Sequence, residues 1–305
     1  MPEITIGMPV YNGERFLEGA LRSILAQTAG DFELLISDNA STDRTREIVR
    51  DIAARDKRIE LRANGKNLGA TQNYNVLVGL ARGRFFKWAA HDDLLAPEYL
   101  ERCMRELAAR PDVIICYPAT TMIDAFGKPT GTDPRDAVKV SAGTPHERFR
   151  GFMASAWPTL GCNAVFGLIR LDALKNTRLV GNYASADKIL LGELALLGKF
   201  HQLTEPLFLR REHAESSVRA NPGVHERNQW FDPLSTGQPG FIHWKWVAEY
   251  LKGIYHSPIP TPEKLRCTAV MRQHLERDKE RLKGELKRPL KLLLSRAGVR
   301  AGKGS

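Results

Sequence analysis

Long apolar runs and clustered cysteines are both missing from this 305-residue sequence. Apolar stretches such as Ile189–Leu191 and Leu292–Leu294 are far shorter than the roughly 18 residues that a membrane-spanning helix needs. The four cysteines are scattered, without a CxxC pair, at Cys103, Cys116, Cys162 and Cys267. This pattern predicts packed, reduced thiols in a cytoplasmic protein rather than a disulfide framework.

The start of the sequence also lacks the pattern of a secretory leader. After Met1–Glu3 the chain enters a strand-like run with neither a basic start nor a long apolar stretch, so we expect no signal peptide. With 43% hydrophobic and 26% charged residues, the composition is typical of a globular chain. It excludes a disordered, collagen-like or disulfide-stapled miniature protein.

Positive charge is in excess, but only at one end of the chain. The formal net charge is +10, and residues 263–305 hold 13 basic and 5 acidic side chains, which leaves 32 basic and 30 acidic ones in the rest. A basic chain can be a nucleic-acid-binding protein, which is one alternative function. The nearly neutral body and the missing RNA-binding motif speak against it, so we expect no nucleic-acid partner.

Strands and helices alternate through the first third of the sequence. This order predicts an α/β fold with a mostly parallel, doubly wound central sheet flanked by helices. The expected strands are Ile4–Val10, Glu33–Ser37, Arg58–Arg62, Arg84–Trp88 and Val113–Tyr117. The expected helices are Glu14–Gln27, a segment around Ile48–Ile52, Asn73–Ala81 and Pro97–Ala109.

After Tyr117 the periodicity is weaker. Residues 118–145 are rich in Pro, Gly, Thr and Asp, which predicts a loop, and the aromatic-rich residues 219–246 are also an expected loop. The expected helices are Arg148–Ala156 and Ser185–Gly198, and the expected strands are Ala164–Arg170 and Gln202–Arg210. From Thr268 to about Ser295, apolar residues recur at helical spacing among basic ones, with interruptions expected at Gly284 and Pro289.

Three of the expected strands end in polar clusters, namely Pro9–Gly13, Ser37–Asp43 and His91–Asp93. Each cluster alone is compatible with a turn, a helix cap or a solvated loop. Together they predict one ligand site, because open parallel sheets bind ligands beyond the carboxyl ends of their strands. The adjacent carboxylates of Asp92 and Asp93 suit Mg²⁺ or Mn²⁺ shared with substrate phosphates. No phosphate-binding glycine motif, HExxH or GxSxG sequence competes with this interpretation.

An ordered set of motifs resembles one known family, the family 2 glycosyltransferases of the GT-A fold, over roughly residues 3–215. The matching segments are Met8–Gly13, Asp38–Thr45, Asn67–Gly69, Asn73, His91–Asp93, Ala186–Leu194 and Arg211–His213. The resemblance implies a GT-A-like (Rossmann-like) sheet with a helical C-terminal extension. It also implies a nucleotide-sugar donor, a divalent metal (Mn²⁺ or Mg²⁺) and inversion at the anomeric carbon.

By the same resemblance, each matching position has an implied role. The residues implied to bind the nucleotide-sugar are Pro9, Val10, Tyr11, Asn12, Asp38, Asn67, Asn73 and Asp92, with Asp38 on a uracil base. The residues implied to hold metal are Asp93, Asp92 and His213, and for His213 a structural role is an equal alternative. Asp187 matches the catalytic base; the alternative is a surface carboxylate at a helix start. Glu193 and Asp172 are the next candidates for the base.

Two positions depart from the family's pattern. Ala90 stands where the family often has the first Asp of an Asp-x-Asp-Asp metal motif. Fewer carboxylates are therefore at hand for metal, which weakens metal binding or shifts it toward His213. Asn39 stands where a second Asp is frequent, and this leaves the base selectivity open.

The motifs and the charge distribution together give an expected organisation. Residues 1–215 form the nucleotide-sugar and catalytic domain, 216–262 an aromatic-rich acceptor or linker region, and 263–305 a basic helical extension. The expected acceptor is a hydroxyl group of a polysaccharide, a lipid-linked or another glycan precursor; the alternative is a catalytically weak nucleotide-binding relative. The basic extension predicts either peripheral contact with the inner face of a membrane or a homodimer.

Overall fold

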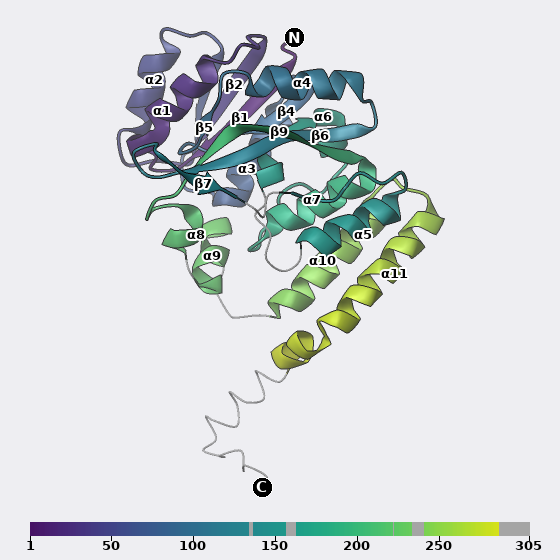
Figure 1. Ribbon diagram of the computed structural model, residues 1–305. Helices are drawn as coiled ribbons and strands as arrows, with labels where there is room; N and C mark the ends of the chain where they lie inside the picture. The colour runs from purple at the N-terminus through teal and green to yellow at the C-terminus, as the bar shows by residue number, and fades with distance from the viewer. Residues whose placement is uncertain (134–136, 157–162, 222, 234–240, 287–305) are drawn as a thin grey trace, which may run out of the picture.

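The computed structural model describes residues 1–133, 137–156, 163–221, 223–233 and 241–286. One mixed sheet with the strand order β3-β2-β1-β4-β8-β6-β9-β5 lies at its centre, and β7 pairs with β6 (Figure 1). Apolar side chains of α1, α2 and α4 pack on one face of this sheet, and those of α3, α5, α6 and α7 on the other. The predicted α/β class with a mostly parallel central sheet is confirmed.

The first half of the sheet is parallel. It contains β1 (Ile4–Val10), β2 (Phe32–Asp38), β3 (Ile59–Ala63) and β4 (Phe85–Trp88), which are connected by α1 (Glu14–Leu25), α2 (Thr45–Ala53) and α3 (Ala70–Leu80). Every residue of β1 and β2 is buried, as expected for parallel strands covered on both faces. Because Val10 pairs with Asp38 at the end of both strands, the segments after β1 and β2 leave the sheet at one edge.

The second half of the sheet is mixed. β8 (Leu168–Arg170) pairs antiparallel with β4 and with β6 (Val113–Ile123), and β6 also forms a hairpin with β7 (Pro129–Thr132). β6 runs parallel to β9 (Lys199–Arg211), which pairs near its end with β5 (Leu94–Leu95). Since β5 directly follows His91–Asp93, the end of β9 is brought beside that loop. α4 (Tyr99–Ala109) connects β5 to β6.

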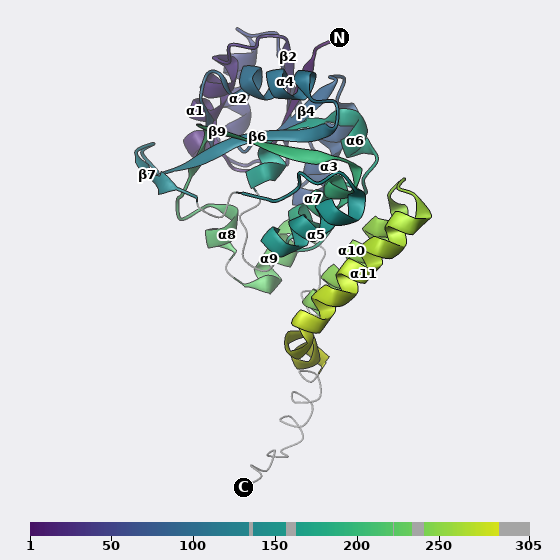
Figure 2. The ribbon, with the colours of Figure 1, turned by 45° about the vertical axis from the view of Figure 1, so that its right-hand side comes forward.

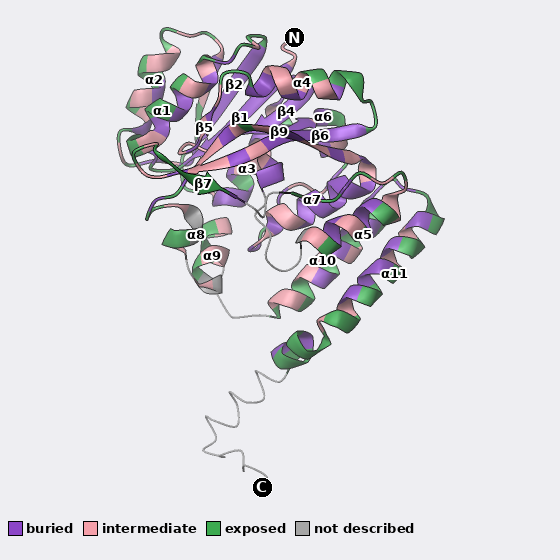
Figure 3. Ribbon diagram, viewed as in Figure 1, coloured by how far each residue is buried: buried purple, intermediate pink, exposed green. Residues whose placement is uncertain are grey.

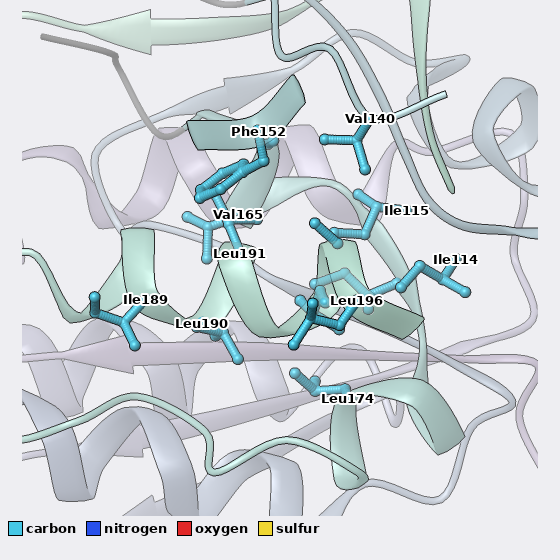
Figure 4. Packing of buried hydrophobic residues seen from close by; sticks show 14 of the residues in the cluster. Ile114, Ile115, Val140, Phe152, Val165, Leu174, Ile189, Leu190, Leu191 and Leu196 are labelled. Carbon is cyan, nitrogen blue, oxygen red and sulfur yellow. The ribbon is translucent and has the colours of Figure 1, made fainter. Parts of the chain in front are cut away.

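The helix α7 (Ala186–Leu197) is the centre of a second layer. Figure 4 shows four of its apolar side chains among residues of α5 (Pro145–Ala156), the 3-10 helix η1 (Asn163–Phe166), α6 (Leu171–Lys175) and β6; the α7 residues are Ile189, Leu190, Leu191 and Leu196. Nearly every residue of α7 is buried, so its first turn is held firmly relative to the sheet.

Two helices near the C-terminus, α10 (Ile242–His256) and α11 (Thr261–Arg277), run side by side in both views (Figures 1 and 2). α10 packs on α7, and α11 packs on α5. Figure 3 shows that the strands are mostly buried, whereas α11 is exposed along much of its length. Two short helices, α8 (Ser217–Ala220) and α9 (Val224–Phe231), precede α10, and α9 contacts α3.

Two predicted loops contain regular structure. The loop predicted over 118–145 is wrong for 118–123, where β6 continues to Ile123, and for 129–132, which form β7. Pro118 has no N–H and suggested the end of a strand, but the β6–β9 register shifts between Pro118 and Thr120 and so accommodates it. The loop predicted over 219–246 is wrong where α9 and the start of α10 lie, since burial of Val247 stabilises a helix that propensity alone does not indicate.

The remaining differences concern boundaries. The strand expected over 164–170 is η1 followed by the short β8, and β5 and α6 are too short to give a periodic signal. The interruption expected at Gly284 is wrong: the helix breaks at Asp278, and residues 279–286 are helical again. Pro289 and Cys162 lie outside the described residues; the other three cysteines are buried and unbridged. No helix in the described part of the chain is long and apolar enough to cross a membrane.

Candidate functional site

The turn after β1 is tied to the loop after β2. Asn12 has a left-handed backbone (φ 50°), its N–H donates to Ser41 Oγ at 2.9 Å, and its Oδ1 accepts the Thr42 N–H at 2.9 Å. Beside it, the Gly13 N–H donates to Thr45 Oγ1 at 2.8 Å. The segment from Pro9 to Asn12 is thereby fixed; Pro9 and Val10 are buried, whereas Tyr11 and Asn12 are exposed.

Asp38 ends β2 with a fully buried side chain. Its Oδ2 accepts a hydrogen bond from Arg46 Nε at 2.5 Å, and its carboxylate also faces the N–H of Ser41 at 3.3 Å. Arg46 comes from α2 and is about one-third exposed, so the pair presents both acceptor and donor atoms at this sheet edge. The sequence motif pointed to Asp38, whereas Arg46 was missed although it lies within the same loop-to-helix segment.

Asn67 and Asn73 belong to a network of amide side chains. Asn73 donates to the Ser37 carbonyl at 2.9 Å and accepts from Ser37 Oγ at 2.6 Å and from Asn64 Nδ2 at 3.0 Å. Asn67 Oδ1 accepts from Asn39 Nδ2 at 2.8 Å. These bonds connect β2, the turn before α3, and α3 itself. Asn73 therefore positions the wall of the site, and Asn39 fills the place of the expected second Asp with a structural role.

Asp92 and His213 meet at the end of β4. Asp92 Oδ2 lies 2.9 Å from His213 Nε2, and the His213 ring packs on Phe16 with 4.5 Å between centroids. Two neighbouring ligands of an octahedral ion at about 2.1 Å lie about 3 Å apart, so this pair fits a divalent cation that also binds diphosphate and water. Within the described ranges no group of three or more His, Cys, Asp and Glu side chains could hold a metal.

Asp93 faces away from that pair. Its Oδ1 accepts the Arg211 N–H at 2.8 Å, and Arg211 Nε donates to the Asp92 carbonyl at 2.8 Å. Burial, together with the neighbouring Asp92 carboxylate, raises the pKa of Asp93 to about 7. Asp93 thus connects the loop to the end of β9, and it is Asp92 that contacts His213.

Asp187 lies in the first turn of α7 and is partly buried. Its Oδ1 accepts the N–H of the next residue, Lys188, at 3.0 Å. Its charge acts on Tyr74 of α3, whose pKa is raised by burial first and then by Asp92, Asp187 and Asp93. Tyr74 was not predicted from the sequence, because it directly follows Asn73 and adjacent positions on a helix point in different directions.

The two reserve candidates for the base are differently placed. Glu193 is buried in α7 and forms an ion pair with Arg178, whose backbone N–H it also accepts at 2.8 Å. Asp172 accepts the N–H of Ala173 at the start of α6. Neither has a contact with the loop that carries Asp92.

Comparison with known proteins gives a family match. The model of a family described as Glycosyl transferase family 2 matches residues 5–177, more than half of the chain. The chain is 28% identical over 195 residues to the chondroitin synthase of Escherichia coli, covering 62% of this chain and 28% of that protein. It spans less than half the length of the first curated relatives that it matches.

Two solved structures share the fold. The crystal structure of S. aureus TarS 1–349 in complex with UDP-GlcNAc matches with a TM-score of 0.62 at 16% identity, covering 90% of this chain and 73% of that one. The mannosyltransferase PcManGT from Pyrobaculum calidifontis, in complex with GDP-Man and Mn²⁺, matches with a TM-score of 0.51 at 17% identity, covering 96% and 81%. At these identities the likeness concerns the fold alone.

Proposed function

Because the chain belongs to glycosyl transferase family 2, we propose that it transfers a sugar from a nucleoside diphosphate sugar to a hydroxyl acceptor, with inversion at the anomeric carbon. The observation that carries the proposal is the contact between Asp92 and His213. It lies at the sheet edge where β1 and β2 also end and the loops after them begin. UDP-sugars are the favoured donors, and the TarS complex with UDP-GlcNAc supports this choice.

The donor would lie along the carboxyl edge of the first four strands. The turn Pro9–Asn12 and the carboxylate of Asp38 would surround the nucleoside, and Arg46 beside Asp38 would donate to base carbonyls. Asp92 and His213 would hold a divalent cation, for which the PcManGT complex with Mn²⁺ is support. When bound, such a cation neutralises the charge that develops on the departing diphosphate.

Asp187 would accept the proton of the acceptor hydroxyl. The acceptor oxygen forms a bond to the anomeric carbon, the bond from that carbon to the diphosphate breaks, and the nucleoside diphosphate leaves with the electron pair. A carboxylate in the first turn of α7 suits this role because α7 is packed rigidly against the sheet. No covalent intermediate is required in this single displacement.

The acceptor would be a glycan, such as a polysaccharide or a lipid-linked precursor. The match with a chondroitin synthase supports a polysaccharide acceptor. We assign the acceptor side to residues 216–262, beyond the nucleotide-sugar domain of 1–215. Within that region the exposed aromatic side chains of Trp230, Phe241 and Trp244 offer the flat apolar faces on which sugars stack.

The proposed function is tested with the purified chain and a panel of UDP-, GDP- and dTDP-sugars. Thermal unfolding with Mn²⁺ or with EDTA measures binding, and release of nucleoside diphosphate in the presence of glycan acceptors measures turnover. We expect metal-dependent stabilisation by one nucleotide class, and release of that nucleotide. Stabilisation without any release would identify a catalytically weak relative, and a lack of binding to every nucleotide-sugar would overturn the proposal.

For the basic extension 263–305 we propose contact with an anionic membrane surface, at the cytoplasmic face. Where its described part ends, Leu286 is 55% exposed, and Trp244, which is 37% exposed, donates its Nε1 hydrogen to the Leu282 carbonyl one turn earlier. A chain ending after Leu286 keeps α11, whose packing on α5 makes it part of the fold. We expect this truncation to lower co-sedimentation with anionic vesicles. A change in oligomeric size, with vesicle binding unaltered, would favour the homodimer instead.

A further inference from the structure

Tyr74 is held at the end of β4 by a tryptophan. Its carbonyl accepts a hydrogen bond from Trp88 Nε1 at 3.2 Å, and the two rings lie 6.1 Å apart between centroids. Trp88 is fully buried, and the loop with Asp92 starts shortly after it. The position of the Tyr74 ring relative to this loop is therefore set by the core.

The same turn of α3 also holds the segment that leads to α7. Thr71 Oγ1 donates to the Gly181 carbonyl at 3.1 Å. Asn75 Nδ2 donates to the Val180 carbonyl at 2.9 Å, and Asn75 Oδ1 accepts the Val180 N–H at 3.1 Å. Tyr74 thus lies on a helix that is fastened both to the β4 end with Asp92 and to the approach to Asp187.

The Tyr74 hydroxyl can donate a hydrogen bond, whereas the carboxylates of this site can only accept one. Ionised carboxylates can only accept hydrogen bonds, whereas a neutral phenol can donate one. Burial and the charges of Asp92, Asp187 and Asp93 raise the pKa of Tyr74, so the hydroxyl keeps its proton at neutral pH. Among the described residues, nothing accepts a hydrogen bond from this hydroxyl, although the rest of the residue is firmly fixed.

A donor sugar would need such a group. In the proposed function the diphosphate lies near Asp92 and the acceptor near Asp187, so the sugar ring lies between these carboxylates. Each sugar hydroxyl that donates to a carboxylate retains lone pairs that require a donor. Among the described residues of this site, Tyr74 has a hydroxyl without a hydrogen-bond acceptor, and it lies on the helix that is fastened both to the β4 end and to the segment before α7.

We propose that Tyr74 is a specificity-determining residue that donates its phenolic hydrogen to an oxygen of the donor sugar, a hydroxyl or an N-acyl carbonyl. The inference rests on the proposed function, because it requires a nucleotide-sugar donor. A single neutral hydrogen bond distinguishes stereoisomers of a sugar only when its direction is fixed, and the anchoring of α3 fixes it. In this proposal Tyr74 contacts the sugar and not the nucleoside diphosphate, so UDP affinity should not depend on its hydroxyl.

The test compares Tyr74→Phe, which removes only the hydroxyl, with Tyr255→Phe as a matched control. Tyr255 is 54% exposed near the end of α10, away from the site. Calorimetry with Mn²⁺ measures the affinity for UDP and for epimeric UDP-sugars, and initial rates give kcat/KM for each donor. For Tyr74→Phe we expect unchanged UDP affinity, about a tenfold fall in kcat/KM for the preferred donor, and a smaller preference between epimers.

Three outcomes would overturn the inference. Tyr74→Phe could keep the wild-type donor preference and rates, which would show that the hydroxyl does not contact the sugar. It could lose UDP affinity and thermal stability together, which would show that Tyr74 has only a structural role. If the wild-type chain binds no nucleotide-sugar at all, the proposed function itself fails, and this result is visible before any variant is compared.

Discussion

The Nε2 atom of His213 lies 2.9 Å from Oδ2 of Asp92, although the residues are 121 positions apart in the sequence. The β5–β9 pairing creates this proximity, because it brings the end of β9 beside the loop that follows β4. Both side chains are largely buried, with 4% of His213 and 17% of Asp92 exposed. The pair is therefore largely shielded from bulk solvent.

The first prediction distinguishes the two adjacent aspartates. Asp92→Asn should lower Mn²⁺-dependent UDP affinity at least about tenfold, because Asn is a weaker ligand than a carboxylate. Asp93→Asn should lose less, since its Oδ1 can still accept the Arg211 N–H. His213→Gln should resemble Asp92→Asn, with the exposed His256→Gln as the matched control. Calorimetry with and without Mn²⁺ measures all four. Equal loss in both aspartate variants would contradict this division of roles.

The second prediction concerns Asp187. A base that removes the acceptor proton acts in the transition state, so Asp187→Asn should lower kcat by about 10²–10⁴-fold and leave donor affinity nearly unchanged. Asp172→Asn is the comparison variant, because that carboxylate accepts the Ala173 N–H within α6 and is, with Glu193, an alternative base from the sequence. Transfer rates together with calorimetric donor affinity decide the matter. Normal turnover by Asp187→Asn would assign the base elsewhere.

Much of the nucleotide side of the site was predictable from the sequence. The strands that end at Val10 and Asp38 are continuous apolar runs, and polar residues follow each at once. The rule that parallel sheets bind ligands at their carboxyl edge then groups these loops without any knowledge of side-chain contacts. The placement of Asp92 beside them follows from the same rule.

The separate roles of the individual residues within the site were not predictable from the sequence. Whether Asp92 or Asp93 faces His213 depends on the short β5–β9 pairing, which leaves no periodic signal in two residues. Arg46 and Tyr74 lie on helices whose orientation is set by packing. The start of α10, up to residue 246, was expected as a loop, because the stability of this helix comes from burial of residues such as Tyr250 against α7 and not from its own propensity.

The third prediction addresses how α11 is attached. Glu263 accepts the His146 N–H at 3.0 Å, lies 2.8 Å from His146 Nδ1, and pairs with Arg266. Burial raises its pKa, but the hydrogen bonds from His146 and Arg266 outweigh this and lower it to about 2. A lowered pKa in the folded state stabilises the protein above the unfolded value of 4.5, and this contribution disappears as the pH falls toward 2.

Glu263→Gln should therefore reduce the free energy of unfolding at pH 7 by about 1–3 kcal/mol and weaken its decrease between pH 4.5 and 2. The exposed Glu276→Gln on the same helix is the control. Urea unfolding at several pH values, followed by circular dichroism, measures the effect. If both variants have the same stability at every pH, Glu263 does not fasten α11 to α5.

The fourth prediction concerns the buried Lys87 on β4, whose side chain is fully inaccessible. Its Nζ contacts the Phe166 carbonyl, lies 3.3 Å from Tyr99 Oη and from the Trp88 carbonyl, and sits 4.4 Å from the centroid of the Tyr99 ring. Burial lowers its pKa from 10.5 to about 7, and no carboxylate forms an ion pair with it within the described chain.

Between pH 7 and pH 10.5 the unfolded chain binds a proton at Lys87 that the folded chain has released. The free energy of unfolding should therefore rise with pH in this interval, by at most about 1.4 kcal/mol per pH unit. Below pH 7 Lys87 is charged in both the folded and the unfolded chain, so the cost of burying the charge is fully present. Lys87→Met removes this titration, so the stability of the wild type relative to this variant should increase from pH 7 to pH 9.5.

The control is Lys57→Met at an exposed position, and its free energy of unfolding should change with pH as that of the wild type does. Urea unfolding across that range measures the difference. If the free energies of unfolding of the wild type and Lys87→Met differ by a constant amount at every pH, Lys87 remains charged in the folded protein. The Phe166 and Trp88 carbonyls would then hold the charged amine.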